Sequence, residues 1–336
     1  MHLAVVSPVF NDWDSFSILV LELSRQFAGS DLELHILAVD DGSSQPFDLN
    51  ALNLPANKCI QDIEVIHLAT NLGHQRAIAV GLAEVCERNK EDLVIIMDSD
   101  GEDRPSDIVS LLGAAQKCPG SIIFASRIRR SEGIAFRLGY VIYKFIFRLL
   151  TGHTITFGNF CLIPITLADR LIHMSELWNN LASAIIRSRL GYQIVPIARG
   201  QRYTGISKMN VTSLIAHGLS AMSVSADLIF VRILIGCSLF SGLLIGGISL
   251  AVLIRFATAL AIPGWATTVV GLLSVLLMQT VVLIVATTLM QLNARNSRPM
   301  IPAADCGTFI KWKQFRTLPT AQPRHAARQG KAVENP

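Results

Sequence analysis

The chain has 336 residues, of which 51% are hydrophobic and only 16% are charged. Soluble domains carry about 25% charged residues, so this composition argues against a wholly soluble protein and against disorder of the whole chain. The net charge of +4 is too small to indicate a nucleic-acid-binding protein. The six cysteines include no C-x-x-C pair and no zinc-type spacing, so we expect scattered reduced thiols.

Apolar runs alternate with amphipathic stretches in the first half of the chain. The runs predict strands at 3–10, 32–39, 63–69, 93–98 and 121–126. Helical periodicity predicts helices at 13–28, 73–89 and 105–116. This alternation predicts an α/β domain with a mostly parallel sheet and helices on both faces. The glycine motifs of dehydrogenases and P-loop proteins are absent, which argues against both classes.

Polar residues follow three of the predicted strands. The first leads into Asn11 and Asp12, the second into VDDGSS (39–44) and the fourth into MDSDGED (97–103). Ligands of such sheets bind at the carboxyl ends of the strands. A single Asp-Asp-Gly is most often an ordinary turn. Acidic residues after neighbouring strands instead favour a bound cation, and alternate acids from residue 98 supply oxygen ligands that suit Mg²⁺ or Mn²⁺.

Two later segments have the character of interfacial helices. Residues 134–150 place basic residues between aromatic and aliphatic ones, with too many charges to span a bilayer. They predict a helix that lies in the membrane interface, or alternatively an amphipathic helix packed on the core. Residues 208–225 predict a second interfacial helix that leads into the membrane.

Two uncharged stretches predict a transmembrane hairpin. Residues 233–254 carry no charge, and a helix of this length spans about 33 Å, enough for a bilayer core. Residues 256–294 are also uncharged but contain a turn at Pro263-Gly264-Trp265, which places the second span at about 267–290.

The distribution of basic residues predicts the orientation. Residues 293–336 contain eight Lys and Arg against two acids, whereas the turn of the hairpin adjoins only Arg255. The positive-inside rule therefore places the domain and both termini in the cytosol. The apolar start of the chain is too short for a signal peptide. We expect the tail to be mostly disordered, with KWKQFR (311–316) either contacting anionic lipid or simply solvated.

The ordered set of motifs resembles the family-2 glycosyltransferases of GT-A fold, and within them the membrane-anchored polyprenyl-phosphate group that includes dolichyl-phosphate mannose synthase. The resemblance covers roughly residues 1–295. Its motifs are PVFND (8–12), VDDGSS, NLGHQRAIAVGL (71–82), DSDGEDRP (98–105), SRIRR (126–130), FGNF (157–160) and RYTGISKMN (202–210). With the predicted spans it implies a catalytic GT-A domain at 1–206, a juxtamembrane helix at 207–231, the hairpin at 232–292 and the tail at 293–336.

The resemblance also implies roles for individual residues. The nucleotide would contact Pro8, Phe10, Asp12, Asp41 and Asp98. A divalent cation, Mg²⁺ or Mn²⁺, would be held on the donor diphosphate by Asp100 with help from Glu102. The phosphates of donor and lipid would be bound by Arg127, Arg137, Arg202 and Lys208, since arginine is suited to forked contacts with phosphate.

Two positions depart from the family pattern. Asn159 stands where many relatives have Asp, and an amide cannot act as a general base. A phosphate acceptor is already largely ionised near neutral pH, so the departure bears on rate and acceptor placement more than on the class of reaction. Phe10 replaces a common Tyr, which preserves ring stacking. His74 matches a family position, and we expect a structural role for it.

The resulting hypothesis is an inverting glycosyltransferase of cell-envelope glycan biosynthesis. It would move a hexose from a UDP- or GDP-sugar to a polyprenyl phosphate, undecaprenyl or dolichyl, at the cytosolic membrane face. Homo-oligomerisation through the hairpin stays open, and no nucleic-acid partner is expected. The alternatives are another acceptor, such as a lipid-linked oligosaccharide, polysaccharide or protein, and a non-catalytic scaffold that binds nucleotide sugar. A processive synthase is disfavoured because the Q-x-x-R-W motif is absent.

Overall fold

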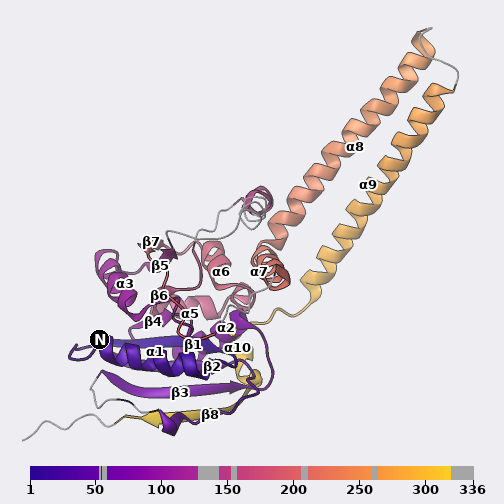
Figure 1. The fold of residues 1–336 in the computed structure, drawn as a ribbon. Helices are drawn as coiled ribbons and strands as arrows, with labels where there is room; N and C mark the ends of the chain where they lie inside the picture. The colour runs from indigo at the N-terminus through magenta and orange to yellow at the C-terminus, as the bar shows by residue number, and fades with distance from the viewer. Residues whose placement is uncertain are drawn as a thin grey trace, which may run out of the picture.

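The computed structural model describes residues 1–52, 54, 59–127, 144–152, 157–205, 211–258 and 264–318. These residues form an α/β domain from which two long helices extend as a hairpin (Figure 1). The expected class, an α/β domain followed by two long apolar helices, is confirmed, although the sheet is mixed rather than mostly parallel.

The described strands form one sheet in the order β7-β5-β6-β4-β1-β2-β3-β8. The five predicted strands correspond to β1 to β5, whereas β6, β7 and β8 were not predicted. The strands are β1 (His2–Val9), β2 (Glu33–Asp40), β3 (Ile60–Leu68), β4 (Leu93–Ile96), β5 (Ile122–Arg127), β6 (Cys161–Pro164), β7 (Tyr192–Ile197) and β8 (Ile310–Thr317).

Parallel pairing at the centre of the sheet brings the acidic strand ends together. β1 pairs in parallel with both β2 and β4, and β2 pairs in parallel with β3. Val9 lies opposite Asp40, and Val6 lies opposite Ile96. The loops after β1, β2 and β4 therefore leave the sheet at one edge. Antiparallel pairs add β6 between β4 and β5, and β8 beside β3.

Helices cover both faces of the sheet, which explains why the central strands are almost continuously apolar. One core packs under α1 (Trp13–Gln26) and α3 (Pro105–Lys117). The other packs under α2 (His74–Arg88), α5 (Ile165–Ile172) and α6 (Leu181–Ser188). The three predicted helices correspond to α1, α2 and α3. Single-turn helices complete the domain at η1 (Leu49–Ala51), η2 (Ser175–Trp178), η3 (Cys306–Phe309) and α10 (Pro302–Asp305).

The hairpin consists of α8 (Ala226–Ala257) and α9 (Trp265–Asn296), each of 32 residues. At 1.5 Å per residue each helix is roughly 48 Å long, more than the ~30 Å of a bilayer core. Only 6% of the most apolar window of each helix is buried, so neither is the core helix of a soluble domain. The predicted spans lie within these helices, although α8 already begins at Ala226. Both helix ends that continue into the rest of the chain lie on the side of the domain (Figure 1).

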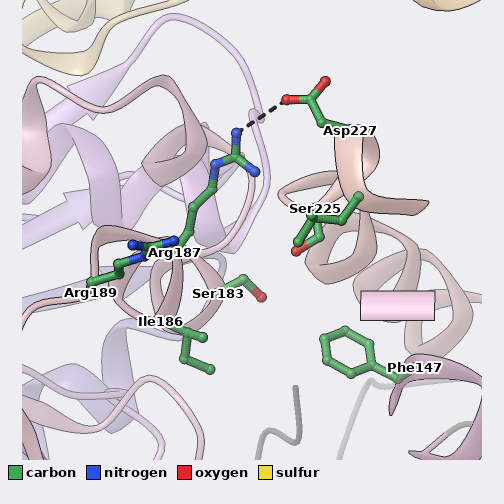
Figure 2. Close-up of a pocket in the computed structure, with 8 residues that line it drawn as sticks. Phe147, Ser183, Ile186, Arg187, Arg189, Ser225 and Asp227 are labelled. Atoms are coloured by element: carbon green, nitrogen blue, oxygen red, sulfur yellow. Dashed lines mark hydrogen bonds and ion pairs between the residues drawn. The ribbon is translucent and has the colours of Figure 1, made fainter. Parts of the chain in front are cut away.

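A polar joint connects the domain to the base of the hairpin. Arg187 of α6 forms ion pairs with Glu176 at 2.7 Å and with Asp227 of α8 at 3.2 Å. Asp227 also accepts a hydrogen bond from Gln291 of α9 at 2.5 Å. A cavity of about 470 Å³ adjoins this joint between α6, the helical residues 144–151 and α8, and Figure 2 shows Arg187 directed across it toward Asp227. The hairpin is therefore fixed to the domain by charge as well as by chain connectivity.

The segments expected at the membrane interface are described only in part. Residues 144–151 are helical, and α7 (Val211–Ser223) leads into α8. The remaining residues of these segments, 134–143 and 208–210, lie outside the described residues. Whether either helix lies in a membrane interface stays a prediction.

The structure corrects the expectation of a disordered tail. After α9 the chain returns to the domain through α10 and η3 and ends, within the described residues, in β8, which pairs antiparallel with β3. Lys313 forms an ion pair with Glu84, and Arg316 donates to the carbonyl of Leu49 at 2.9 Å. Lys313 and Arg316 of KWKQFR are therefore held by the domain, so the charge of these two residues alone misidentified the segment. Residues 319–336 lie outside the described part.

Candidate active site

The loops after β1 and β2 are tied together at the acidic edge of the sheet. Asn11 has a left-handed backbone, with φ 49°, and its amide donates to Ser43 Oγ at 2.8 Å. Asn11 Oδ1 accepts from the amide of Ser44 at 3.0 Å. Phe10 beside it is 45% exposed, whereas Pro8 is buried within β1. Of these two residues predicted to contact the nucleotide, Phe10 is accessible to a ligand, whereas Pro8 is enclosed in the sheet.

The two acids predicted to contact the nucleoside differ in their surroundings. Asp41 is buried, and its carboxylate accepts from the amides of Leu72 at 2.7 Å and Gly73 at 3.0 Å. Burial raises the pKa of Asp41, and these two hydrogen bonds partly offset that rise. Asp12 is half-buried, and its Oδ1 accepts from Thr204 Oγ1 at 3.3 Å. Asp41 thus anchors the loop before α2, while Asp12 lies beside the segment around residue 202.

An ion pair joins the loop after β4 to this later segment. Arg202 donates to Asp100 Oδ2 from Nε at 3.1 Å and from a terminal nitrogen at 2.5 Å. The backbones are also bonded, because the amide of Tyr203 donates to the carbonyl of Asp100 at 2.8 Å. The Asp100 Oδ1 atom accepts from the amide of Glu102 at 2.9 Å. The structure therefore brings together two predicted residues that are 102 positions apart in the chain.

Arg127, at the end of β5, bridges two further acids of the same loop. It donates to Glu102 at 2.9 Å and to Asp103 at 2.8 Å. Glu102 is also paired with Arg199 at 2.6 Å. The Asp103 side chain is only 2% exposed; burial and the charge on Asp98 raise its pKa to about 7, although Arg127 acts against this rise. Arg127 is thus the cation that lies closest to the buried acid.

Asp98 and Asn159 meet at His74, the first residue of α2. His74 Nε2 lies 3.3 Å from Asp98 Oδ1 and 3.1 Å from Asn159 Nδ2. A protonated Nε2 donates to Asp98, whereas an unprotonated one accepts from Asn159. Asn159 Oδ1 accepts from Gln75 Nε2 at 3.0 Å, so both ends of its amide are held. Although a third of the Asp98 side chain is exposed, burial and then the charge on Asp100 raise the pKa of Asp98 to about 7.

The chemistry of these side chains suits a divalent cation, which binds carboxylate oxygens. Asp98 Oδ1 is buried, and among the described residues its neighbouring donor is His74 Nε2 at 3.3 Å, so a neutral imidazole with an unprotonated Nε2 leaves this oxygen free for a cation. In this arrangement arginines occupy the carboxylates of Asp100 and Glu102, and the described residues contain no preformed group of three metal-binding side chains. The residue types fit the cation, but binding at Asp100 or Glu102 requires the arginines to exchange partners.

Close backbone packing holds the acidic loop against the 199–204 segment. A Cβ on Gly200 would overlap the carbonyl oxygen of Gly101, and the Gly200 amide donates to the carbonyl of Glu102 at 2.9 Å. Replacing Gly200 by Ala is expected to separate the segments and lower stability by about 1–3 kcal/mol, with loss of activity. Thermal unfolding and turnover of the full chain measure both effects. Gly113→Ala in α3, where nothing lies within 4 Å of the added Cβ, is the control and should not destabilise. Equal behaviour of the two variants would contradict the packing argument.

The structure gathers most of the predicted site but changes the interpretation of some members. Asp98, Asp100, Glu102, Arg127, Asn159 and Arg202 meet at one edge, with Phe10 and Asp12 beside them. Pro8 and Asp41 are buried and support the loops. Arg137 and Lys208 lie outside the described residues.

Sequence reasoning missed three residues that contact this site. His74 was expected to be structural, yet it contacts both Asp98 and Asn159. Arg199 and Asp103 were not singled out, although each is paired with a predicted residue. Asp103 stands in the quoted DSDGEDRP motif, and Arg199 lies three residues before Arg202. The available signal was membership of this motif for Asp103 and proximity to Arg202 for Arg199.

Comparison with known proteins identifies the class of this domain. Residues 4–164 match the model of glycosyl transferase family 2. This range contains most of β1, all of β2 to β6 and the acidic loops of the site. The segment is therefore a glycosyl transferase family 2 domain, and the resemblance drawn from the motifs is confirmed at the level of the family.

Curated relatives are similar over part of their length. The chain is 24% identical over 137 residues to dodecaprenyl-phosphate galacturonate synthase of Rhizobium johnstonii, covering 41% of this chain and 39% of that protein. It is 34% identical over 117 residues to undecaprenyl-phosphate 4-deoxy-4-formamido-L-arabinose transferase of Edwardsiella ictaluri, covering 34% of each. The matches thus span about a third to two fifths of these relatives. Among solved structures, glucosyl-3-phosphoglycerate synthase of Mycobacterium tuberculosis has a TM-score of 0.49 at 14% identity, over 68% of this chain and 79% of that one.

Proposed function

We propose that this protein is a membrane-bound, inverting glycosyltransferase that moves a hexose from a UDP- or GDP-sugar to a polyprenyl phosphate at the cytosolic face. The observation that carries the proposal is the pairing of acids and arginines at the carboxyl edge of the sheet, within a glycosyl transferase family 2 domain. The names of the curated relatives, which are polyprenyl-phosphate sugar transferases or synthases, support this acceptor class.

The acidic loop would bind a divalent cation on the donor, and the arginines would bind its phosphates. Asp100, helped by Glu102, would hold a divalent cation, Mg²⁺ or Mn²⁺, which supplies positive charge to the departing nucleoside diphosphate. Arg127 and Arg202 would exchange their carboxylate partners for phosphate oxygens, to which guanidinium groups donate two hydrogen bonds at once. Most of the catalysis would then come from positioning and electrostatic stabilisation.

The acceptor phosphate needs little help from a base. Asn159 cannot remove a proton, but a phosphate monoester that is already ionised attacks the sugar directly. The amide of Asn159 is fixed by Gln75 and His74, so it is suited to orient a phosphate by donating a hydrogen bond. We infer that Asn159 positions the acceptor.

The hairpin supports a location at the membrane. α8 and α9 are long and apolar enough to cross a bilayer and expose their apolar side chains, such as Leu243 and Leu253. Because both helix ends that continue the chain lie beside the domain, the domain and β8 would face the same side of the membrane (Figure 1). The basic residues that flank these ends favour the cytosolic side.

The proposal is tested by sugar transfer with purified full-length protein in detergent. The assay contains Mn²⁺ or Mg²⁺, undecaprenyl phosphate and a panel of radiolabelled UDP- and GDP-sugars, and it measures label in the organic phase. We expect lipid-linked label with one donor and its loss in EDTA. Nucleotide release without lipid product would shift the acceptor to another class. Intact donor under every condition would favour a scaffold that binds nucleotide sugar without transferring it.

A further inference from the structure

The side chains of β8 divide between two different neighbours. Lys313 and Phe315 face α2, where Lys313 pairs with Glu84 and the Phe315 ring lies 5.9 Å from the Arg88 guanidinium carbon. Trp312, Gln314 and Arg316 alternate with them and therefore face the opposite side of the sheet. The strand thus has an α2 face and a second face, which we call the loop face, formed by Trp312, Gln314 and Arg316.

Each residue of the loop face contacts one of two neighbours. Trp312 contacts β3, whereas Gln314 and Arg316 contact residues 47–52, which follow the predicted nucleotide-binding loop. The Trp312 ring stacks on His67 of β3, with ring centres 3.8 Å apart and planes 10° apart. Gln314 donates to the carbonyl of Phe47 at 3.2 Å. Arg316 donates to the carbonyls of Leu49 at 2.9 Å and Leu52 at 2.8 Å. Strand β8 therefore holds one side of residues 47–52.

A short chain of hydrogen bonds leads from His67 to the predicted nucleotide site. His67 Nδ1 lies 2.7 Å from Asp40 Oδ2, and Asp40 Oδ1 accepts from the amide of Ser43 at 2.8 Å. Ser43 Oγ accepts from the amide of Asn11 at 2.8 Å. Burial alone would raise the pKa of Asp40, but its bonds with His67 and Ser43 lower it below its ordinary value. Asp40 is therefore held as a carboxylate that fixes the loop.

The other side of the same loop is fixed by α1. The Phe47 ring stacks on Trp13 with centres 4.3 Å apart, and Trp13 Nε1 donates to the carbonyl of Gln45 at 3.1 Å. The segment 41–47 is thus contacted by α1 on one side and by the loop face of β8 on the other. His67 Nε2 is buried and has no hydrogen-bond partner among the described residues, so Asp40, the stacked Trp312 ring and the Trp13 ring, whose centre lies 6.3 Å away, are the contacts that orient the imidazole.

We propose that the loop face of β8 positions residues 41–47 and thereby sets the affinity of the site for the nucleoside diphosphate part of the donor. Trp312 acts through His67 and Asp40 and is a positioning residue. The inference rests on the proposed function, because it assigns the loop to the donor. The inference implies that β8, the outermost strand beside β3, supports the donor site although it follows the hairpin in the chain.

The first test measures the loop itself and needs no nucleotide. Amide hydrogen exchange of residues 41–52 is compared in full-length wild type, Trp312→Ala and Phe315→Ala in detergent. Loss of the stacked ring is expected to speed exchange about three- to tenfold in Trp312→Ala. Phe315→Ala is the matched control, because it removes an exposed ring from the α2 face of the same strand. Equal exchange in both variants would overturn the positioning role.

The second test measures nucleotide affinity by calorimetry with UDP and GDP in the presence of Mn²⁺. We expect the Kd of the bound nucleotide to rise about three- to tenfold in Trp312→Ala, with wild-type values in Phe315→Ala and recovery in Trp312→Phe. In turnover assays the donor KM should rise by a similar factor, while the KM for undecaprenyl phosphate stays constant. Gln314→Ala gives an independent readout should Trp312→Ala fail to fold, and we expect a smaller shift in the same direction.

The outcomes separate this inference from the proposed function. Nucleotide binding by the wild type with unchanged affinity in Trp312→Ala and Gln314→Ala would overturn the inference and leave the glycosyltransferase proposal intact. A loop that loosens in Trp312→Ala in a protein whose wild type binds neither nucleotide would overturn the donor assignment, while supporting β8 as the element that positions the loop.

Discussion

Replacing Asp100 by Asn is expected to lower kcat by about 10²–10³-fold or more while the protein stays folded. The change keeps an oxygen that can accept from the Glu102 amide, but it removes the charge that pairs with Arg202 and that a divalent cation requires. An amide is a weak ligand for Mg²⁺ or Mn²⁺ where the leaving diphosphate gains negative charge. The measurement is label transferred to undecaprenyl phosphate, with thermal unfolding as the test of folding.

Asp107→Asn is the matched control for this experiment. Asp107 lies on α3, nine residues after Asp98. Its carboxylate is paired with Arg104 at 2.7 Å rather than with Arg127 or Arg202. The same loss of charge there should leave turnover close to wild type. Turnover by Asp100→Asn at the wild-type rate would remove Asp100, and the cation assigned to it, from the mechanism.

The central part of the site was predictable because parallel strands end at one edge. Asp98 and Asp100 follow a strand that pairs with β1, so the sequence pattern alone placed them beside Asn11 and Asp12. Arg202 is different, since it is 102 positions from Asp100 and no local pattern links the two. Its assignment came from the family resemblance, and the ion pair in the structure is consistent with a shared site.

Two predictions, the disordered tail and the structural role of His74, missed contacts for the same physical reason. In both cases the contact partners are distant in sequence. Most of the side chains of β8 are polar or charged, so its pattern resembles a solvated tail. Its strand conformation comes from pairing with β3 and from Trp312 stacking on His67. His74 matched a family position but was assigned a structural role, and its neighbours in space are Asp98 and Asn159.

The apolar hairpin shows the opposite case, in which composition and length were sufficient to predict two long helices. Both predicted spans fall within α8 and α9, which are long and apolar enough to cross a membrane. Composition gave no information on the joint at the base, where Arg187 pairs with Asp227, because both residues are ordinary charged positions in sequence.

Arg127→Ala is expected to destabilise the protein as well as inactivate it. The guanidinium donates to Asp103, whose side chain is 2% exposed, and to Glu102. Without it Asp103 retains the amide of Asp98 as its hydrogen-bond donor and lies beside other acids. Removing one member of a buried pair costs about 3–5 kcal/mol. For a domain of this size we therefore expect Tm to fall by roughly 6–20 °C.

The measurement is thermal unfolding of the full chain in detergent, with Arg25→Ala as the control. Arg25 forms a pair of similar length with Glu22, at 2.8 Å, but its side chain is 69% exposed, so its removal should shift stability by about 1 kcal/mol or less. Arg127→Lys should recover part of the stability and little of the activity, because one ammonium cannot donate to both carboxylates in the geometry of the guanidinium fork. An Arg127→Ala protein that unfolds at the temperature of Arg25→Ala would show that the acidic loop holds its conformation without this arginine, and its role would then be confined to phosphate binding.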